Sequence, residues 1–251
     1  MFTVPQKTPV IMGILNATPD SFSNGGRSAV PEDAFTMIGD GADILDIGGE
    51  STRPGAADVS VQEELDRVLP LIEAIRRRSD IPISVDTRKP AVAQEAISRG
   101  VQIINDASCL GDSAMIAVLT ESDVSYILMH TRGTPQTMES LAVYNADVTG
   151  EVHAELEAAR KRLTDAGIAG ERILIDPGFG FAKRPEQSIE ILNNLDRLTD
   201  LGTLVAGISR KRFTGGNEET SIDYARIALA KGAKIIRTHN VSLTRTLLGN
   251  L

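Results

Sequence analysis

Two carboxylates and an amide stand out as residues that could do chemistry. Asp86, Asn105 and Asp176 each follow a short run of apolar residues. A carboxylate can accept two parallel N–H bonds from a guanidine-like edge, so two acids and an amide suit a flat heterocycle with several N–H donors. Each residue alone could equally be a helix cap or a loop stabiliser. The three together favour a binding site.

A second group of candidate residues is basic. Lys211, Arg237 and His239 lie at the ends of two later apolar runs, and Arg53 lies in an earlier segment. Arginine offers bidentate geometry and lysine a point charge, so the group suits a phosphate or diphosphate. The alternative for Arg237, and more so for Arg210, is a solvated basic edge.

A third candidate is Asn16, which precedes the Gly-containing segment Ala17–Gly26. Magnesium is usually held by one or two protein oxygens together with ligand phosphates and waters, so one asparagine facing a diphosphate could serve. The chain has three histidines and one cysteine, with no zinc-type spacing. The pair Gly25-Gly26 could hinge a mobile lid, and we expect mobility near 23–27 and 53–57.

The apolar runs that precede these residues predict the fold. A buried parallel strand reads as a continuous apolar run, and a barrel of such strands gathers its active site at their carboxyl ends. The polar residues that end the runs, in chain order, are Asn16, Asp46, Asp86, Asn105, His130, Asp176, Ser209-Arg210-Lys211 and Arg237-Thr238-His239. The runs themselves are Val10–Leu15, Ile44-Leu45, Ile83–Val85, Ile103-Ile104, Ile127–Met129, Ile173–Ile175, Leu204–Ile208 and Ile235-Ile236.

Helical segments separate the expected strands. Three begin with proline in the first turn, at Pro31, Pro90 and Pro185. Thr220 with Asp223 resembles a capping box. Apolar periodicity predicts further helices, namely Val61–Arg77, Val148–Leu163, Ser188–Leu198, Ile222–Ala230 and Ser242–Leu251.

A repeated turn joins these helices to the strands that follow them. Gly41, Gly100 and Gly232 each end a helix three residues before a strand. The pattern predicts one (β/α)8 barrel domain over residues 1–251. A doubly wound open sheet is the rival, but no dinucleotide-type glycine motif follows the first run.

Bulk composition restricts the function classes. The 251 residues suit one barrel. A net charge of −8 and a pI near 5.0 argue against a general nucleic-acid or membrane-surface role. The single cysteine, Cys109, cannot form an internal disulfide and is expected to be unreactive, which fits the cytoplasm. We expect no signal peptide and no membrane span.

Seven segments, in register from about residue 10 to 240, resemble the signatures of the dihydropteroate synthase family of pterin-binding barrels. The resemblance implies a transferase of folate biosynthesis and a sulfonamide target. Such an enzyme joins (7,8-dihydropterin-6-yl)methyl diphosphate to 4-aminobenzoate and releases dihydropteroate and diphosphate. The segments are Gly13–Ser23, Gly48–Gly55, Ser84–Thr87, Ile104–Asp106, Asp176–Phe181, Ser209–Lys211 and Arg237–His239.

The resemblance also implies roles for individual residues, a magnesium cofactor and a homodimer formed near the C-terminal end. Catalysis falls to Asp86, Lys211, Arg237 and His239. The pterin falls to Asp86, Asn105, Asp176 and Lys211; the diphosphate to Arg53, Arg237 and His239; magnesium to Asn16; and the aminobenzoate pocket to Thr52, Pro54, Phe181 and Lys211, with Gly207 completing the substrate-binding set.

The chain departs from the family pattern at a few places. Arg212 stands where the family has a hydroxyl residue that helps to hold the aminobenzoate carboxylate, which predicts altered sulfonamide affinity. Thr131 stands where a larger apolar residue is common. The stretch from Lys211 to Arg237 and the last helix are short, which leaves a non-catalytic pterin-binding paralogue as one alternative. A methyltetrahydrofolate-dependent methyltransferase domain is the other, although it has no need of a diphosphate site.

Overall fold

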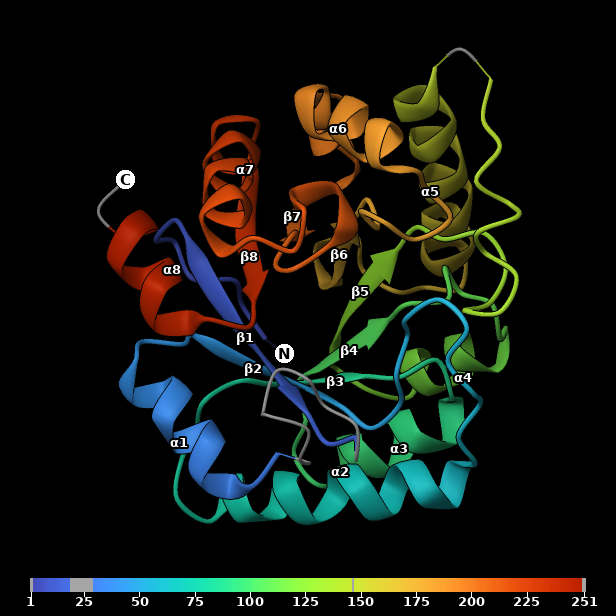
Figure 1. Ribbon diagram of the computed structural model, residues 1–251. Helices are drawn as coiled ribbons and strands as arrows, with labels where there is room; N and C mark the ends of the chain where they lie inside the picture. Colours follow the sequence, from blue (N-terminus) through green and yellow to red (C-terminus); the bar gives the residue numbers. More distant parts are fainter. Residues whose placement is uncertain (1, 19–28, 146, 250–251) are drawn as a thin grey trace.

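The computed structural model describes residues 2–18, 29–145 and 147–249. Its strands form one closed barrel in which each strand pairs with its neighbours in chain order and the last pairs with the first (Figure 1). All the pairs are parallel. The strands are β1 Val10–Asn16, β2 Ile44–Gly48, β3 Ile83–Asp86, β4 Ile103–Asp106, β5 Ser125–Met129, β6 Ile173–Asp176, β7 Leu204–Gly207 and β8 Ala233–Thr238.

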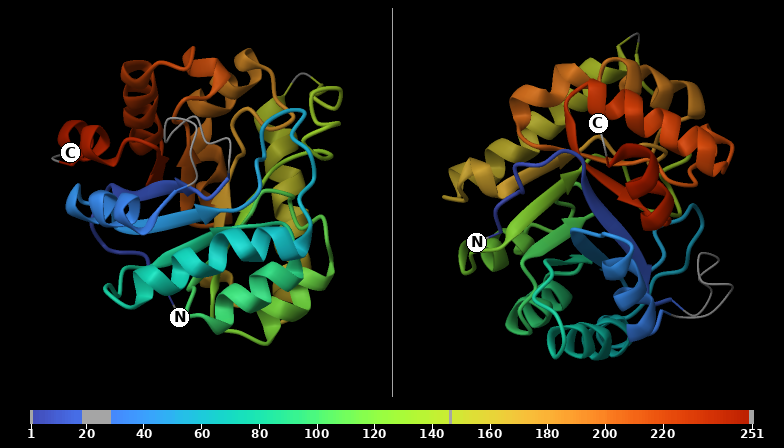
Figure 2. Two further views of the ribbon diagram at one scale, coloured as in Figure 1. Left: turned by 60° about the horizontal axis from the view of Figure 1, so that its bottom comes forward. Right: turned by 90° about the vertical axis from the view of Figure 1, so that its left-hand side faces the viewer.

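Helices lie outside the strands, one after each, as Figures 1 and 2 show from three sides. The architecture is therefore the predicted (β/α)8 barrel. The α-helices are α1 Pro31–Gly39, α2 Val61–Arg76, α3 Pro90–Ser98, α4 Ala114–Thr120, α5 Val148–Asp165, α6 Pro185–Asn193, α7 Glu218–Ala230 and α8 Val241–Leu248. Short 3-10 helices cover Gly170–Arg172, Leu195–Leu201 and Arg212–Thr214.

Local sequence signals explain most of the helix boundaries. Pro31, Pro90 and Pro185 open α1, α3 and α6, as predicted. The recurring glycines before β2, β4 and β8 all have positive φ, between 83° and 98°. They end the preceding helices in the left-handed conformation that glycine adopts without steric cost.

Three predicted boundaries were wrong. The capping box at Thr220 is not the start of α7: the helix begins at Glu218, and the Asn217 side chain accepts from the Thr220 backbone N–H at 3.1 Å. Asparagine is as strong a cap as threonine, and Glu218 suits the positive end of the helix dipole. The predicted helix 188–198 begins earlier, at Pro185, and passes into a 3-10 helix after Asn193. The third error concerns β2, which continues beyond Asp46 to Gly48.

The core has two apolar layers. One lies between the barrel and its helices. The other fills the barrel interior, and the N-terminal residues Phe2 and Val4 pack against it. Each fully buried aliphatic side chain contributes roughly 2 kcal/mol, so these layers supply the stability against which a polar layer can be held. The interior residues are Val10, Met12, Ile44, Ile103, Ile127, Leu174, Val205 and Ile235.

In the described part of the chain, no helix has both the length and the apolar composition that crossing a membrane requires.

Candidate active site

Strand register brings the predicted site residues to one side of the barrel wall. Asp86 pairs with Asn105 across β3 and β4, and Gly207 pairs with Arg237 across β7 and β8. Asp176 pairs with Met129 of β5. Side chains alternate between the two faces of a strand, so these residues point inward, directly above the interior aliphatic layer. The register thus converts widely separated sequence positions into one polar layer.

Asp46 lies at the centre of this layer and is fully buried. Its Oδ2 accepts from Asn105 Nδ2 at 3.1 Å and from Arg237 Nε at 2.6 Å. Arg237 also donates from Nη2 to Asp86 Oδ2 at 2.9 Å. Asp46 Oδ1 has no hydrogen-bond partner among the described residues. The guanidinium of Arg237 thus lies between Asp46 and Asp86, and its assignment to the diphosphate stays a prediction.

Burial controls the protonation of the two predicted acids. It raises the pKa of Asp86 to about 7, although the Arg237 guanidinium opposes the rise. Burial also raises the pKa of Asp176, against the opposing charge of Lys211 and a hydrogen bond from the Gly178 N–H to Oδ1 at 2.7 Å. Both carboxyls therefore sit in surroundings that favour a ligand with complementary N–H donors.

Lys211 stands opposite the acids, and burial lowers its pKa to about 8. Its Nζ lies 4.7 Å from the centroid of the Phe181 ring. Gly207 leaves the space between these groups open. A Cβ on this residue would lie 3.5 Å from Asp176 Oδ2, 3.6 Å from Lys211 Nζ and 3.9 Å from Arg237 Cδ. One methyl group would therefore occupy the place where three charged groups converge.

A cluster of cations surrounds His239. Its Nδ1 lies 3.0 Å from the Ser209 hydroxyl. Burial, followed by the charges of Arg237, Arg210, Arg53 and Lys211, lowers the pKa of His239 to about 3. The imidazole is neutral at pH 7, and the four cations around it create the positive potential that attracts an anion.

The loop after β2 carries Thr52, which is half-buried, and Arg53 and Pro54, which are exposed. The segment 53–57, for which mobility is expected, contacts the loop after β5: Gly55 N–H donates to Pro135 O at 2.9 Å and Gln136 Nε2 donates to Ala56 O at 2.7 Å. Its mobility stays a prediction. The expected mobile segment 23–27, with Gly25-Gly26, lies outside the described residues.

Glu50 closes the base of this loop. Its carboxylate accepts from Val59 N at 2.9 Å, Arg88 Nε at 3.0 Å and Lys89 Nζ at 2.9 Å. Despite the cost of burial, the Arg88 and Lys89 hydrogen bonds lower the pKa of Glu50 to about 2. Lys89 also reaches Glu64, which is fully buried in α2. At its base the loop is thus anchored to Arg88 and Lys89, which follow β3, and through Lys89 to α2. At its tip it is anchored to the loop after β5.

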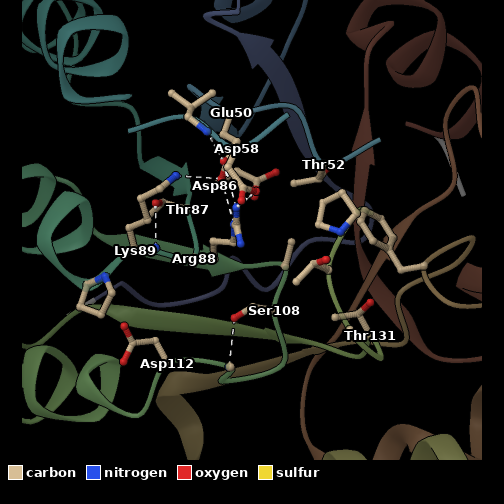
Figure 3. Close-up of a pocket in the computed structure, with 18 of the residues that line it drawn as sticks. Glu50, Thr52, Asp58, Asp86, Thr87, Arg88, Lys89, Ser108, Asp112 and Thr131 are labelled. Carbon is tan, nitrogen blue, oxygen red and sulfur yellow. Dashed lines mark hydrogen bonds and ion pairs between the residues drawn. The ribbon is translucent and has the colours of Figure 1, made fainter. Parts of the chain in front are cut away.

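A cavity of about 690 Å³ opens beside the polar layer (Figure 3). Thr52, Asp86 and Phe181 line it among the predicted site residues. The remaining lining comes from the loops after β2, β3, β4 and β5 and from the first residues of α2, α3 and α4, and it includes Thr131 and Ser108. Because Asp86 belongs to both, the cavity is continuous with the central cluster.

Asn16, at the carboxyl end of β1, is half-buried at the same mouth. Its Oδ1 is 3.8 Å from the position of a Cβ on Gly48, so glycine leaves the amide approachable from that side. No group of three or more His, Cys, Asp or Glu side chains among the described residues could hold a metal by itself. One amide oxygen fits a magnesium ion whose other ligands are phosphates and waters.

Two further predicted residues lie near the mouth. Cys109 is poorly exposed, and burial raises the pKa of its thiol to about 11, as expected for an unreactive cysteine. Arg212 is exposed in the 3-10 helix after Lys211, and its Nη1 donates to Glu139 Oε1 at 2.8 Å. The guanidinium is therefore already paired with the β5 loop.

Sequence reasoning missed Asp46 and Glu50 as site residues. Asp46 was taken as the end of a strand, but an acid flanked by apolar residues on both sides, as in Leu45-Asp46-Ile47, signals an inward position within a longer strand. The pairing of Glu50 depends on residues 38 and 39 positions away, so no local pattern pointed to it.

Comparisons with known proteins agree with this geometry. The chain belongs to the pterin-binding enzyme family, whose model matches residues 12–239. Its relatives include the dihydropteroate synthases of Escherichia coli K12, 44% identical over 94% of this chain and 88% of the relative, and of Synechocystis, 43% identical over 94% and 86%.

Solved structures show the same likeness. The Yersinia pestis dihydropteroate synthase in complex with a sulfonamide drug has a TM-score of 0.90 and 39% identity, covering 96% of this chain and 92% of the other. The Burkholderia cenocepacia dihydropteroate synthase complexed with 7,8-dihydropteroate has a TM-score of 0.85 and 38% identity, covering 98% and 91%.

Proposed function

We propose that this protein is a dihydropteroate synthase. It joins the pterin methylene of (7,8-dihydropterin-6-yl)methyl diphosphate to the amine of 4-aminobenzoate, and diphosphate leaves. The observation that carries the proposal is the inward convergence of Asp86, Asn105 and Asp176 opposite the cations around His239. One end of the site suits an N–H-rich ring and the other suits an anion.

The acids of the polar layer would hold the pterin. Asp176 and Asp86 accept N–H bonds from the ring, and the Asn105 amide, fixed by Asp46, supplies a further polar contact. Gly207 leaves room for the ring between Asp176 and Lys211. Arg237 forms ion pairs with Asp46 and Asp86, so it also holds these two carboxylates in place.

The cation cluster would hold the diphosphate. Arg53 and Arg237 contribute positive charge, and the neutral His239 contributes an N–H donor. Magnesium, when bound, would neutralise charge on the departing diphosphate. Among the described residues, Asn16 is the one we assign to it.

The 4-aminobenzoate would lie against Phe181, Thr52, Pro54 and Lys211. Its amine is a weak nucleophile, so departure of diphosphate must lead. Positive charge then develops on the pterin methylene and negative charge on the leaving group. Preorganised acids near the ring and cations near the diphosphate stabilise both charges without reorganisation. This route requires no general base, and the functions of Asp86, Lys211, Arg237 and His239 are electrostatic.

The test is diphosphate release from purified protein mixed with the pterin diphosphate, magnesium and 4-aminobenzoate. The proposal expects release that depends on 4-aminobenzoate, with dihydropteroate as the product. Retained binding of pterin diphosphate without condensation would instead identify an inactive pterin-binding paralogue. Corrinoid-dependent methyl transfer from methyltetrahydrofolate would identify the methyltransferase alternative.

We further propose a homodimer through α7 and α8. These neighbouring helices expose Ile227 and Leu247, and Arg226 of α7 donates to the Leu247 carbonyl at 3.4 Å. Light scattering of the parent and of Ile227→Lys checks this, because a charge at an apolar contact should shift the protein towards monomer. Cys109, which forms no disulfide, supports a cytoplasmic location.

A further inference from the structure

Lys183 is a buried lysine to which the proposed chemistry assigns no role. It lies in the loop between β6 and α6, here called the β6 loop, and is 7% exposed. Its Nζ lies 2.8 Å from His130 Nδ1, 3.0 Å from Phe181 O, 3.1 Å from Gly178 O and 3.3 Å from His130 O. Three carbonyl oxygens and one imidazole nitrogen thus enclose the ammonium. Burying a charge costs free energy unless its hydrogen bonds are satisfied, and these four contacts satisfy those of Lys183. We therefore looked for a function of Lys183 in the contacts it makes.

Two of those carbonyls belong to the loop that carries Phe181. The loop is tightly wound: Gly178, Gly180 and Ala182 all have positive φ. A Cβ on Gly178 would lie 1.9 Å from the His130 carbonyl oxygen, so the loop passes directly over the end of β5. Buried carbonyls need partners, and Lys183 supplies them to this loop at two points.

His130 continues the contact outward. Hydrogen bonds from His130 and Arg132 lower the pKa of Glu155 to about 2, so Glu155 is a carboxylate and can only accept. The ring proton of His130 therefore resides on Nε2, and Nδ1 accepts from Lys183. Nε2 then donates to Glu155 Oε2 at 3.0 Å, and Glu155 also accepts from Arg132 Nε at 3.1 Å. Burial and the Lys183 charge lower the pKa of His130 to about 4, which keeps the ring neutral. A continuous polar chain therefore runs from α5 to the β6 loop.

The β6 loop determines the position of Phe181 more than that of Asp176. Asp176 belongs to β6, where strand pairing with Met129 fixes its backbone. Phe181 lies five residues beyond that strand, and its backbone carbonyl is held by Lys183. Its ring faces Lys211 Nζ at 4.7 Å. Loss of the Lys183 contacts should therefore displace Phe181 and leave Asp176 in place.

We propose that Lys183, locked by His130 and Glu155, is a positioning residue that fixes the Phe181 ring for 4-aminobenzoate. The inference rests on the proposed synthase function. It assigns Lys183 to the orientation of the aromatic amine and not to the pterin. Lys183 touches neither substrate and acts through the backbone of the loop.

The test measures KM for each substrate in Lys183→Met, which keeps an unbranched side chain of similar reach but removes the donors. We expect KM for 4-aminobenzoate to rise at least about tenfold, because small misplacements of a positioning group are costly. KM for the pterin diphosphate should stay within about threefold, because strand pairing holds Asp176 in place. A general loss of folded protein would not change the two KM values differently. Lys161→Met is the matched control, because that lysine is exposed on α5 and pairs with Asp165.

A double variant shows whether the effect passes through Phe181. Residues that act through one contact give non-additive changes. Lys183→Met added to Phe181→Ala should leave KM for 4-aminobenzoate where Phe181→Ala alone puts it. Additive changes, or equal changes in both KM values, overturn the proposal. An inactive parent protein would instead contradict the synthase function itself.

Nuclear magnetic resonance of the parent protein tests the geometry without any variant. The chain has three histidines, so the ring nitrogens can be assigned. We expect His130 to carry its proton on Nε2 at pH 6, which lies below the pKa of about 7 to which burial lowers Lys183 and above the pKa of His130. A proton on Nδ1 at this pH would exclude a hydrogen bond from the Lys183 ammonium and overturn the proposal. If Lys183→Met does not fold, Glu155→Gln, at a partly exposed position, should show the same separation of KM values at smaller size.

Discussion

Arg237 donates from Nε to Oδ2 of Asp46 over 2.6 Å, and the two residues stand 191 positions apart in the chain. Asp46 is fully buried. Removing one partner of a buried ion pair leaves an uncompensated charge, so Arg237→Met should lower the free energy of unfolding by about 3–5 kcal/mol. Urea unfolding measures this.

Arg99→Met is the control for that variant, because Arg99, just after α3, pairs with Glu73 of α2 at the exposed surface. Its effect should be below about 1 kcal/mol. Adding Asp46→Asn to Arg237→Met should restore part of the loss. A loss below about 1 kcal/mol in Arg237→Met would show that the pair contributes nothing beyond a surface bridge.

The pKa of Asp86, raised to about 7 by burial, predicts a pH dependence of activity. The carboxylate form accepts N–H bonds from the pterin, so kcat/KM for pterin diphosphate should rise as the pH passes through about 7. At pH 8, Asp86→Ala should lose about 3 kcal/mol of transition-state stabilisation. Turnover within threefold of the parent would remove Asp86 from the site.

The raised pKa of Asp86 also makes the stability of the folded protein depend on pH. Its folded pKa of about 7 exceeds the unfolded value of 3.8, so its contribution is present below pH 3.8 and is lost as the pH rises through about 7. Asp86→Asn should remove this dependence, together with the acid limb of the activity profile. An unchanged limb in that variant would assign it to another group.

Gly207→Ala should separate binding from stability. The added methyl would enter the space between Asp176, Lys211 and Arg237, at ordinary contact distances from each. Without ligand, the substitution should stabilise the strand by about 0.5 kcal/mol, because alanine loses less backbone entropy than glycine. Calorimetry should show weaker binding of pterin diphosphate, by about tenfold or more, the size of one lost good contact. Binding equal to that of the parent would place the ring elsewhere.

Glu50→Gln should loosen the loop that carries Thr52 and Arg53. It removes a carboxylate that accepts from Arg88, Lys89 and Val59 and should cost about 2 kcal/mol at pH 7, as for hydrogen bonds to charged groups. The pKa of Glu50 is lowered from 4.5 to about 2, so its contribution is present above pH 4.5 and is lost as the pH falls towards 2. Thermal unfolding from pH 2 to pH 7 should show this loss in the parent and in the control Glu63→Gln, which replaces an exposed glutamate, but not in Glu50→Gln.

Arg212→Ser and Glu139→Gln form an opposing pair. Arg212 is adjacent to Lys211, and its guanidinium is partly neutralised by Glu139. Arg212→Ser removes positive charge from the rim and should raise KM for 4-aminobenzoate and the sulfonamide inhibition constant by about threefold to tenfold. Glu139→Gln frees the guanidinium and should lower both values. Equal sulfonamide inhibition constants for the parent and Arg212→Ser would refute a role for Arg212.

The sequence predicted the strand ends well, because a buried parallel strand must be apolar and its first polar residue marks the mouth of the barrel. Asp86, Asn105 and Asp176 were found in this way, and the register places all three inward. The same rule failed for Asp46, since an inward polar residue inside a strand looks like the end of that strand. The continuation of β2 to Gly48 depends on pairing with β3, which local composition does not encode.

Long-range polar contacts were beyond the reach of the sequence. The Lys183 ammonium meets His130 from 53 positions away, and Glu50 meets Arg88 from 38 positions away. Such partners are brought together by the closed barrel and not by periodicity. The start of α7 shows the local form of the problem: Asn217 and Thr220 are both cap-forming residue types, and the structure uses Asn217.

Because β8 closes the barrel by pairing with β1, the barrel cannot be completed until β8 has been synthesised on the ribosome. Asn16 emerges early, whereas Arg237 and His239 emerge after all seven earlier strands have been made. Until then, Asp46 lacks its guanidinium partner, β1 and β7 present open edges, and the cation cluster is incomplete. Substrate binds the finished barrel and stabilises only that form. Translation of the last strand is thus the event that turns a nascent chain into a protein able to hold its ligands.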